Sequence, residues 1–224
     1  MINLGSPDST SVADVRKYLD EFLMDKRVIG KSYWFRWFLV KIIILNTRPK
    51  KSSEAYKKIW WKEGSPLIVL SERLFKKVEK KLEIPVALAM RYGSISINKG
   101  LKELSDKGVK EVIVLPLYPH YAMSSYETVV VKVEDEISKN FPWLKKKTIP
   151  IFYKNKEYIK VMVQNIQKHL KEIQYDHILF SYHGLPESHL KISDPTNTHC
   201  LKKENCCSSK SLAHETCYRH QVLE

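Results

Sequence analysis

Short apolar runs that stop abruptly at glycine, proline or polar residues are the feature that most limits the fold of this chain. They alternate with stretches in which apolar residues recur every three or four positions, as they do on one face of a helix. The clearest apolar run covers residues 111–116 and ends at a proline. Alternating strand and helix patterns are typical of βαβ units, so we predict an α/β protein with a parallel sheet and helices on both of its faces.

The pattern also assigns the individual elements. After a first strand that ends near Asn3, further strands are expected at residues 84–90, 111–116, 148–152 and 177–182. Helices are expected from Ser11 onward and at residues 56–61, 67–81, 97–107, 127–139 and 156–171. The aromatic segment before Pro49 is expected to end at this proline, which blocks further helix. The Phe-Pro-Trp-Leu segment at residues 141–144, followed by the lysine run at 145–147, is the best candidate for a join, which predicts domains at 1–145 and 146–224.

The composition is that of a globular protein, with 43% hydrophobic and 28% charged residues among 224. The formal net charge of +13 has a simple explanation in lysines spread over helix faces, so we expect no nucleic-acid binding from charge alone. An anionic substrate or an acidic membrane surface fits the same excess of positive charge.

Neither a basic start nor a long apolar leader precedes the first predicted strand, which predicts a cytoplasmic location. The segment from Tyr33 to Leu45 is apolar and rich in aromatic residues, but it is too short to span a bilayer and contains Arg36 and Lys41. A buried helix is one interpretation. The other is a lip that covers a ligand or makes peripheral contact with the inner membrane.

Unusual polar residues follow the predicted strand ends, where ligands bind in open α/β sheets. They are Asn3, Ser6, Arg91, Tyr92, Tyr118, Ser124 and, after the last apolar run, His183. Together with Arg48, the arginines and tyrosines could hold a flat, anionic, aromatic ligand, because guanidinium groups bind carboxylates in a bidentate manner. The alternative is that each is an ordinary loop residue.

All four cysteines lie close together near the end of the sequence, at Cys200, Cys206, Cys207 and Cys217. Grouped thiols in a cytoplasmic chain favour a metal site over disulfides. Adjacent cysteines can bind one centre only if the backbone turns between them. An iron–sulfur cluster, structural zinc and free thiols all remain open from this spacing.

Five stretches taken together resemble the motifs of ferrochelatases, in the same order along the whole chain. They are Asn3-Leu4-Gly5-Ser6-Pro7-Asp8, Gly64-Ser65-Pro66-Leu67, Met90-Arg91-Tyr92-Gly93, Leu115-Pro116-Leu117-Tyr118-Pro119-His120-Tyr121 and Phe180-Ser181-Tyr182-His183-Gly184-Leu185-Pro186. The resemblance implies two Rossmann-like, chelatase-like domains and insertion of ferrous iron into protoporphyrin IX during heme biosynthesis. Coproporphyrin as the substrate, or porphyrin and heme binding without turnover, are the alternatives.

The resemblance also implies residue roles. His183 matches the active-site histidine that accepts pyrrole protons or delivers Fe(II), and Arg48 matches an arginine that binds a propionate. Leu4, Ser65, Arg91, Tyr92 and Tyr118 match positions in the porphyrin pocket. The four cysteines resemble a segment that holds a 2Fe-2S cluster in some bacterial ferrochelatases.

One departure from the family pattern concerns an acidic residue. Ferrochelatases are longer, and a glutamate in their second domain faces the active-site histidine. Glu224 does not lie in the motif that carries that glutamate. We therefore expect a fragment with a truncated second domain and impaired turnover.

Overall fold

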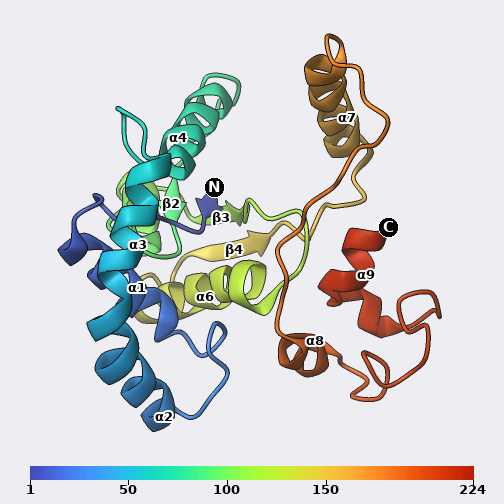
Figure 1. Ribbon diagram of the computed structural model, residues 1–224. Helices are drawn as coiled ribbons and strands as arrows, with labels where there is room; N and C mark the ends of the chain where they lie inside the picture. Colours follow the sequence, from blue (N-terminus) through green and yellow to red (C-terminus); the bar gives the residue numbers. More distant parts are fainter. The chain divides into compact units, whose positions relative to one another are not determined.

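The computed structural model describes residues 1–224, and the chain divides into two compact units. The first unit contains residues 1–117 and 124–149, and the second contains residues 118–123 and 150–224. Figure 1 shows the elements of both units. The predicted domain boundary at residue 145 stays a prediction.

Four short parallel strands form the centre of the first unit. They are β1 (Ile2–Asn3), β2 (Ala89–Met90), β3 (Glu111–Val114) and β4 (Lys145–Thr148). β1 pairs with β2 and β3 pairs with β4, and a parallel bridge from Ile2 to Pro116 joins the two pairs. The resulting order, β2-β1-β3-β4, is the beginning of a flavodoxin-like doubly wound sheet. The predicted α/β class with parallel pairing is confirmed.

The helices of the first unit follow the strands in the expected alternation (Figure 1). They are α1 (Val12–Leu23), α2 (Tyr33–Trp37), a π-helix (Phe38–Ile44), α3 (Leu45–Ile59), α4 (Pro66–Glu79), α5 (Ile97–Asp106), a π-helical turn (Met123–Glu127) and α6 (Thr128–Asn140). α1 packs against α3, and α5 packs against α6 and β2.

The start of α1 follows directly from the sequence. The Ser11 side chain accepts a hydrogen bond from the backbone N–H of Asp14 and so caps the helix. Val15, Leu19 and Leu23 then line one face and bury against Val40 and Leu45. α1 and the segment from Tyr33 to Leu45 are therefore held together by one apolar core.

Pro49 does not stop the helix, contrary to the sequence-based prediction. It lies inside α3, which runs from Leu45 to Ile59. Proline removes one N–H donor and crowds the preceding turn. Here the preceding turns are already wider, because the Leu45 N–H bonds to the Val40 carbonyl in the π-helical pattern.

Three predicted strands also differ in the structure, two in the first unit and one, at residues 177–182, in the second. Only the last two residues of 84–90 pair, because β1 offers pairing partners only to Ala89 and Met90. The predicted strand at 148–152 is replaced by β4, which uses the three lysines assigned to the domain join. β4 has only one neighbour in its sheet, and lysines are common on such edge strands.

The second unit is built from helices and loops around a small core. It contains α7 (Lys156–Leu170), α8 (Glu187–Ser193), a 3₁₀-helix (Leu212–Glu215) and α9 (Tyr218–Leu223). Leu190, Cys200, Ala213 and Cys217 form the core, whereas α7 buries none of its residues. Residues 177–182 form no strand, and Leu179 is 92% exposed. A strand requires a neighbour for its backbone groups, and no strand lies in this unit.

Candidate active site

The ends of β1 and β2 bring two predicted pocket residues together. The Arg91 N–H donates to the Asn3 carbonyl over 2.8 Å, and the Tyr92 N–H donates to the Leu4 carbonyl over 2.9 Å. Gly5 makes this approach possible, because a Cβ built there would lie 1.9 Å from the Tyr92 carbonyl oxygen. Leu4 and Tyr92 thus lie side by side at the carboxyl edge of the sheet.

A cavity of about 210 Å³ opens next to these strand ends. Its lining includes Ser6, Ser65, Met90 and Tyr92. Ser65 is the N-cap residue of α4 and Pro66 is its first helical residue, which places the helix start at the cavity. Pockets for whole ligands are usually about 300–1,000 Å³, so this cavity suits one edge group of a larger molecule.

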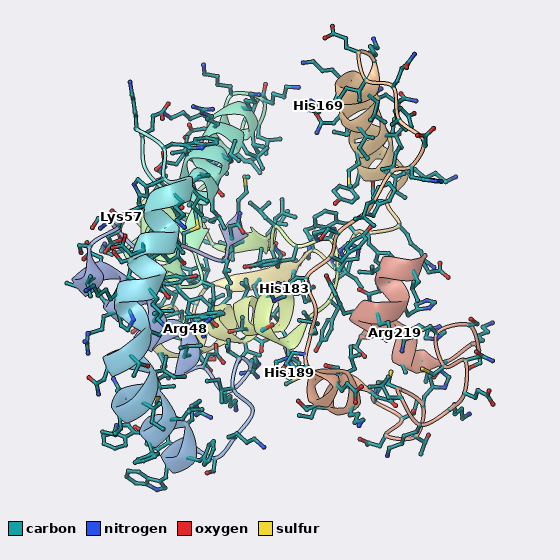
Figure 2. All side chains as sticks on the ribbon, viewed as in Figure 1. Arg48, Lys57, His169, His183, His189 and Arg219 are labelled. Carbon is teal, nitrogen blue, oxygen red and sulfur yellow. The ribbon has the colours of Figure 1, made fainter.

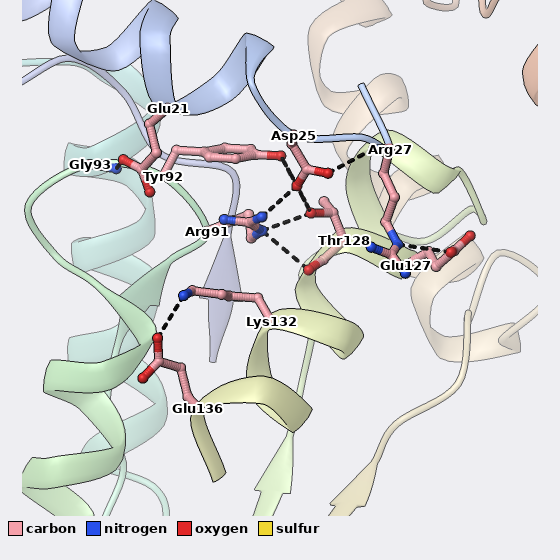
Figure 3. Close-up of polar contacts among 10 residues, drawn as sticks. All are labelled: Glu21, Asp25, Arg27, Arg91, Tyr92, Gly93, Glu127, Thr128, Lys132 and Glu136. Carbon is pink, nitrogen blue, oxygen red and sulfur yellow. Dashed lines mark hydrogen bonds and ion pairs between the residues drawn. The ribbon is translucent and has the colours of Figure 1, made fainter. Parts of the chain in front are cut away.

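Arg91 lies beside the cavity residue Tyr92, and its charge is satisfied within the chain (Figure 3). Its guanidinium forms an ion pair with Asp25 and donates to the Thr128 hydroxyl over 2.7 Å and to the Thr128 carbonyl over 3.1 Å. It also lies 4.2 Å from the centre of the Tyr92 ring. Arg91 therefore holds together the α1–α2 loop, the end of β2 and the start of α6.

The same network sets the ionisation of Asp25. Burial opposes its charge, but hydrogen bonds from Thr128 and the Arg27 backbone, with the positive charge of Arg91, outweigh burial and lower the pKa of Asp25. Tyr92 donates to the same carboxylate over 2.9 Å. Burial is also the main reason why the pKa of Tyr92 is raised. Asp25 therefore stays ionised at neutral pH, and Tyr92 stays uncharged.

The remaining predicted pocket residues lie elsewhere. Arg48 is exposed on α3, as Figure 2 shows, and it is not among the residues that line the cavity. Ser124 is half-buried in the π-helical turn before α6, and Tyr118 is half-buried in the second unit. The cavity lining thus includes Ser65 and Tyr92, with Leu4 and Arg91 beside Tyr92, but neither Arg48 nor Ser124.

His183 lies in the second unit on an extended segment, and its side chain is exposed (Figure 2). An aromatic contact anchors this segment. Tyr182 contacts the His120 ring edge-to-face at 6.2 Å between centroids, and Tyr218 contacts the same ring edge-to-face at 5.8 Å. Burial lowers the pKa of His120. The predicted catalytic imidazole is therefore open to water, while the neighbouring Tyr182 packs on the His120 ring.

The aromatic segment from Tyr33 to Leu45, called the lip below, exposes large apolar side chains. Trp34 is 76% exposed, and Tyr33, Phe35, Phe38, Ile42 and Ile43 are exposed as well. Its two cations are held within the chain: Arg36 donates to the carbonyls of Ile29 and Lys31, and Lys41 pairs with Asp20 over 2.5 Å. The lip therefore offers an apolar outer face. No helix of the chain is long and apolar enough to cross a membrane.

The cysteine segment is organised by Asp194. Its carboxylate accepts hydrogen bonds from the backbone N–H groups of Thr196, His199 and Cys200 and from the Thr196 hydroxyl. Burial opposes this charge, but the hydrogen bonds outweigh it and hold the pKa of Asp194 far below its usual value. The start of the segment is thereby fixed at Cys200.

Three histidines fix the turn at the adjacent cysteines. His199 Nε2 and His214 Nε2 lie 2.7 and 2.9 Å from the Cys206 carbonyl oxygen, and His220 Nδ1 lies 2.8 Å from the Cys207 carbonyl oxygen. A carbonyl only accepts, so each of these ring nitrogens must carry the proton. Asn205 precedes the pair in a left-handed conformation with φ of 53°. The backbone turn that adjacent cysteines require for a shared centre is present.

The thiols lie close in pairs. Cys200 and Cys217 lie in the same buried core, and Cys206 and Cys207 are adjacent in the chain. Burial, followed by the neighbouring thiols, raises the pKa of Cys200 to about 12 and that of Cys207 to about 11. No group of three or more His, Cys, Asp or Glu side chains is arranged to hold a metal ion. The donor atoms thus suit a thiolate-bound centre, whereas their present spacing is that of two thiol pairs.

Several of these residues could not have been selected from the sequence. Asp25 and Thr128 meet Arg91 across 66 and 37 positions. The three histidines were visible next to the cysteines, and their proximity in sequence was the only signal for them. No sequence pattern marks Tyr218, whose contact with the His120 ring depends on the fold of the second unit.

The fold and the strand-end residues together define an α/β protein with a parallel sheet and a cavity at the carboxyl edge of that sheet. The sequence profile of the Ferrochelatase family matches residues 1–223. A curated ferrochelatase from Opitutus terrae is 47% identical over 226 residues, which cover 100% of this chain and 65% of that protein. Ferrochelatases from Pseudomonas syringae pathovar tomato and Azotobacter vinelandii are each 44% identical over 225 residues, covering 100% of this chain and 66% of each relative. The chain belongs to the ferrochelatase family, and it spans about two thirds of the length of these relatives.

Proposed function

We propose that this chain carries out or contributes to insertion of Fe(II) into protoporphyrin IX, giving protoheme in heme biosynthesis. Membership of the ferrochelatase family along residues 1–223 is the observation that carries this proposal. Fe(II) is a substrate of this reaction rather than a resident cofactor. Two pyrrole N–H groups lose their protons as the ring nitrogens bind the metal, and no electron is transferred.

His183 is the proposed acceptor of the pyrrole protons. A neutral imidazole has an ordinary pKa of about 6.5, so it can take up and release protons near neutral pH. Its exposed ring, next to a tyrosine side chain that packs on His120, supports this role. The same nitrogen lone pair could receive Fe(II) before insertion.

The porphyrin would be held by the strand-end residues and by Arg48. The exposed guanidinium of Arg48 suits a propionate, and the small cavity at Ser65 and Tyr92 suits an edge group of the ring. Leu4, Tyr118 and Ser124 are proposed as further contacts. Arg91 is proposed to act by holding Tyr92 and the loop at Asp25, because its donors are engaged within the chain.

The lip is proposed to collect the apolar substrate and to touch the surface of the inner membrane from the cytoplasmic side. Exposed patches of this kind mark membrane or ligand contacts. The internal bonds of Arg36 and Lys41 support the proposal, because they engage both cations with groups of the chain itself.

The four cysteines are proposed to hold a 2Fe-2S cluster. The fit rests on four thiols, of which Cys200 and Cys217 share a buried core, and on a backbone turn at Cys206 and Cys207 fixed by three histidines. Such a cluster can carry one electron when bound. Because metal insertion consumes no electron, its proposed contribution is to hold the cysteine segment together.

An anaerobic metalation assay tests the reaction. The chain is incubated with Fe(II) and either protoporphyrin IX or coproporphyrin, and porphyrin absorbance reports binding and metalation separately. We expect His183-dependent metalation of protoporphyrin IX, with His183→Ala slowing it by about 100-fold or more and leaving porphyrin binding intact. His169→Ala is the matched control, since His169 is exposed on α7.

The other outcomes are equally decisive. Faster metalation of coproporphyrin than of protoporphyrin IX would assign coproporphyrin as the substrate. Porphyrin binding without metalation would indicate a carrier, and wild-type rates in His183→Ala would remove His183 from the mechanism.

A further inference from the structure

One histidine of the sequence motifs has no part in the proposed reaction. His120 lies in the loop at residues 118–123, which belongs to the second unit together with His183. Burial lowers the pKa of His120, so its ring is neutral at neutral pH. A neutral imidazole is a flat aromatic ring, so it can pack against other rings without the cost of burying a charge.

The loop that carries His120 is held by hydrogen bonds on both sides of that residue. The Pro119 carbonyl accepts from the Tyr153 N–H over 2.9 Å. The Tyr121 N–H donates to the Gln221 side-chain oxygen over 2.7 Å. The residues before and after His120 are therefore tied to two other segments of the second unit, and the backbone of His120 has a defined place between them.

Three tyrosine rings contact the His120 imidazole. Tyr153 stacks on it, with ring centroids 5.8 Å apart and an angle of 27° between the planes. Tyr182 and Tyr218 meet it edge-to-face, at 6.2 and 5.8 Å between centroids. Aromatic pairs in this distance range are stabilised beyond the area that they bury. His120 is therefore a shared contact of tyrosines from three different parts of the second unit.

The contact with Tyr182 bears on the reaction, because Tyr182 directly precedes His183. Residues 171–186 contain no helix or strand, and Leu179 is 92% exposed, so regular backbone pairing does not hold this segment. Successive Cα atoms are only about 3.8 Å apart. A Tyr182 ring that is held on His120 therefore limits where the His183 backbone can lie, while the His183 side chain stays exposed.

We propose that His120 is a positioning residue for His183 and acts through the ring of Tyr182. Its own loop is held by hydrogen bonds at Pro119 and Tyr121, and its ring passes this order to a segment without helix or strand. His120 contacts neither porphyrin nor Fe(II) in this role. The inference rests on the proposed role of His183 as proton acceptor, and it adds a residue that holds the acceptor in place.

Chymotrypsin cleavage of the whole chain tests the ring contact directly. Cleavage after Tyr182 requires its ring to leave His120 and enter the pocket of the protease, whereas Leu179 is 92% exposed and serves as the internal reference. We expect His120→Ala to raise the ratio of first cuts after Tyr182 to first cuts after Leu179 by about threefold to tenfold, because the edge-to-face contact is lost. Mass spectrometry of the single-cut fragments gives this ratio.

Two further variants and one further cleavage site separate the ring contact from a general loosening. His120→Phe keeps an aromatic ring and should keep the wild-type ratio. His169→Ala removes an exposed imidazole from α7 and should leave the ratio unchanged. Cleavage after Tyr158, inside α7, reports unfolding of the second unit. An unchanged ratio in His120→Ala, or an equal rise at Tyr158 and Tyr182, would overturn the inference.

Metalation kinetics add the functional readout. A displaced His183 should lower kcat for metal insertion by about tenfold or more in His120→Ala and leave KM for porphyrin unchanged, with His120→Phe close to wild type. Tyr182→Leu should cause a similar loss, and the double variant should be no slower than either single one, because both changes remove the same contact. Losses that multiply in the double variant would overturn the path through Tyr182. If the wild-type chain metalates no porphyrin, the proposed reaction fails, and the cleavage ratio alone decides the positioning role.

Discussion

The carboxylate of Asp25 and the guanidinium of Arg91 form an ion pair inside the first unit, where their side chains are only 6% and 12% exposed (Figure 3). Each also has neutral partners, Tyr92 and Thr128 for the carboxylate and Thr128 for the guanidinium. Buried charges persist in proteins when they are paired and hydrogen-bonded in this way.

Removing Asp25 should therefore be costly. We expect Asp25→Ala to lower the free energy of unfolding by about 3–5 kcal/mol, because Arg91 would remain buried without its counter-charge. Urea unfolding measures this loss. Asp106→Ala breaks an exposed pair with Lys102 and serves as the control, for which only a small change is expected.

Asp25 should also give the unit an acid-sensitive stability. Its pKa is lowered in the folded state, so its contribution is fully present above the unfolded pKa of about 3.9 and is lost as pH falls through the folded pKa. The difference in unfolding free energy between wild type and Asp25→Asn should therefore shrink from pH 6 toward pH 2. A constant difference across that range would contradict the assigned pKa direction.

A comparison of Gly5 with Gly64 can separate the cost of a steric clash from the cost of backbone strain. Gly5 has φ of +105° and no room for a Cβ beside the Tyr92 carbonyl, whereas Gly64 has φ of +127° and a Cβ added there would meet nothing within 4 Å. Gly64→Ala should cost only the strain, about 1–3 kcal/mol. Gly5→Ala should cost clearly more, and thermal unfolding of the two variants compares them. Equal losses would show that the strand ends can separate without penalty.

His214 should matter for metal binding by the cysteines. Phenylalanine retains the ring but cannot donate to the Cys206 carbonyl, whereas glutamine retains a donor. We expect His214→Phe to weaken binding of Co(II), followed by its thiolate charge-transfer absorption, by about 10–100-fold, and His214→Gln to recover part of it. His169→Phe controls for loss of an imidazole. Equal affinity in wild type and His214→Phe would exclude this supporting role.

The lip should bind lipid through its exposed aromatic residues. Trp34→Ser should reduce binding to vesicles of phosphatidylglycerol and phosphatidylethanolamine several-fold, because it removes the most exposed of those rings. Trp143→Ser removes a tryptophan that is 60% exposed outside the lip and should have no effect. Sedimentation with vesicles measures both, and equal losses would argue against a localised contact surface.

Local patterns were sufficient for much of the first unit. The Ser11 cap, the apolar face of α1 and the alternation of strands and helices each depend on residues close in sequence, and the structure has them. Strand lengths were overestimated wherever apolar character was taken as evidence for pairing. At residues 177–182 the apolar run is real, but a strand also needs a neighbour, which local sequence does not specify.

The candidate site divides in the same way. Its motifs identified the family and named His183, Ser65 and Tyr92, because short motifs are contiguous in sequence. Sequence did not indicate that Arg91 is paired with Asp25, or that Tyr182 and Tyr218 both pack on the ring of His120. Sequence alone thus determined the fold class and the chemistry of the side chains, since both follow from residue type and local order. Tertiary structure alone decided which of those side chains are already paired, because partners distant in sequence meet only when the chain folds.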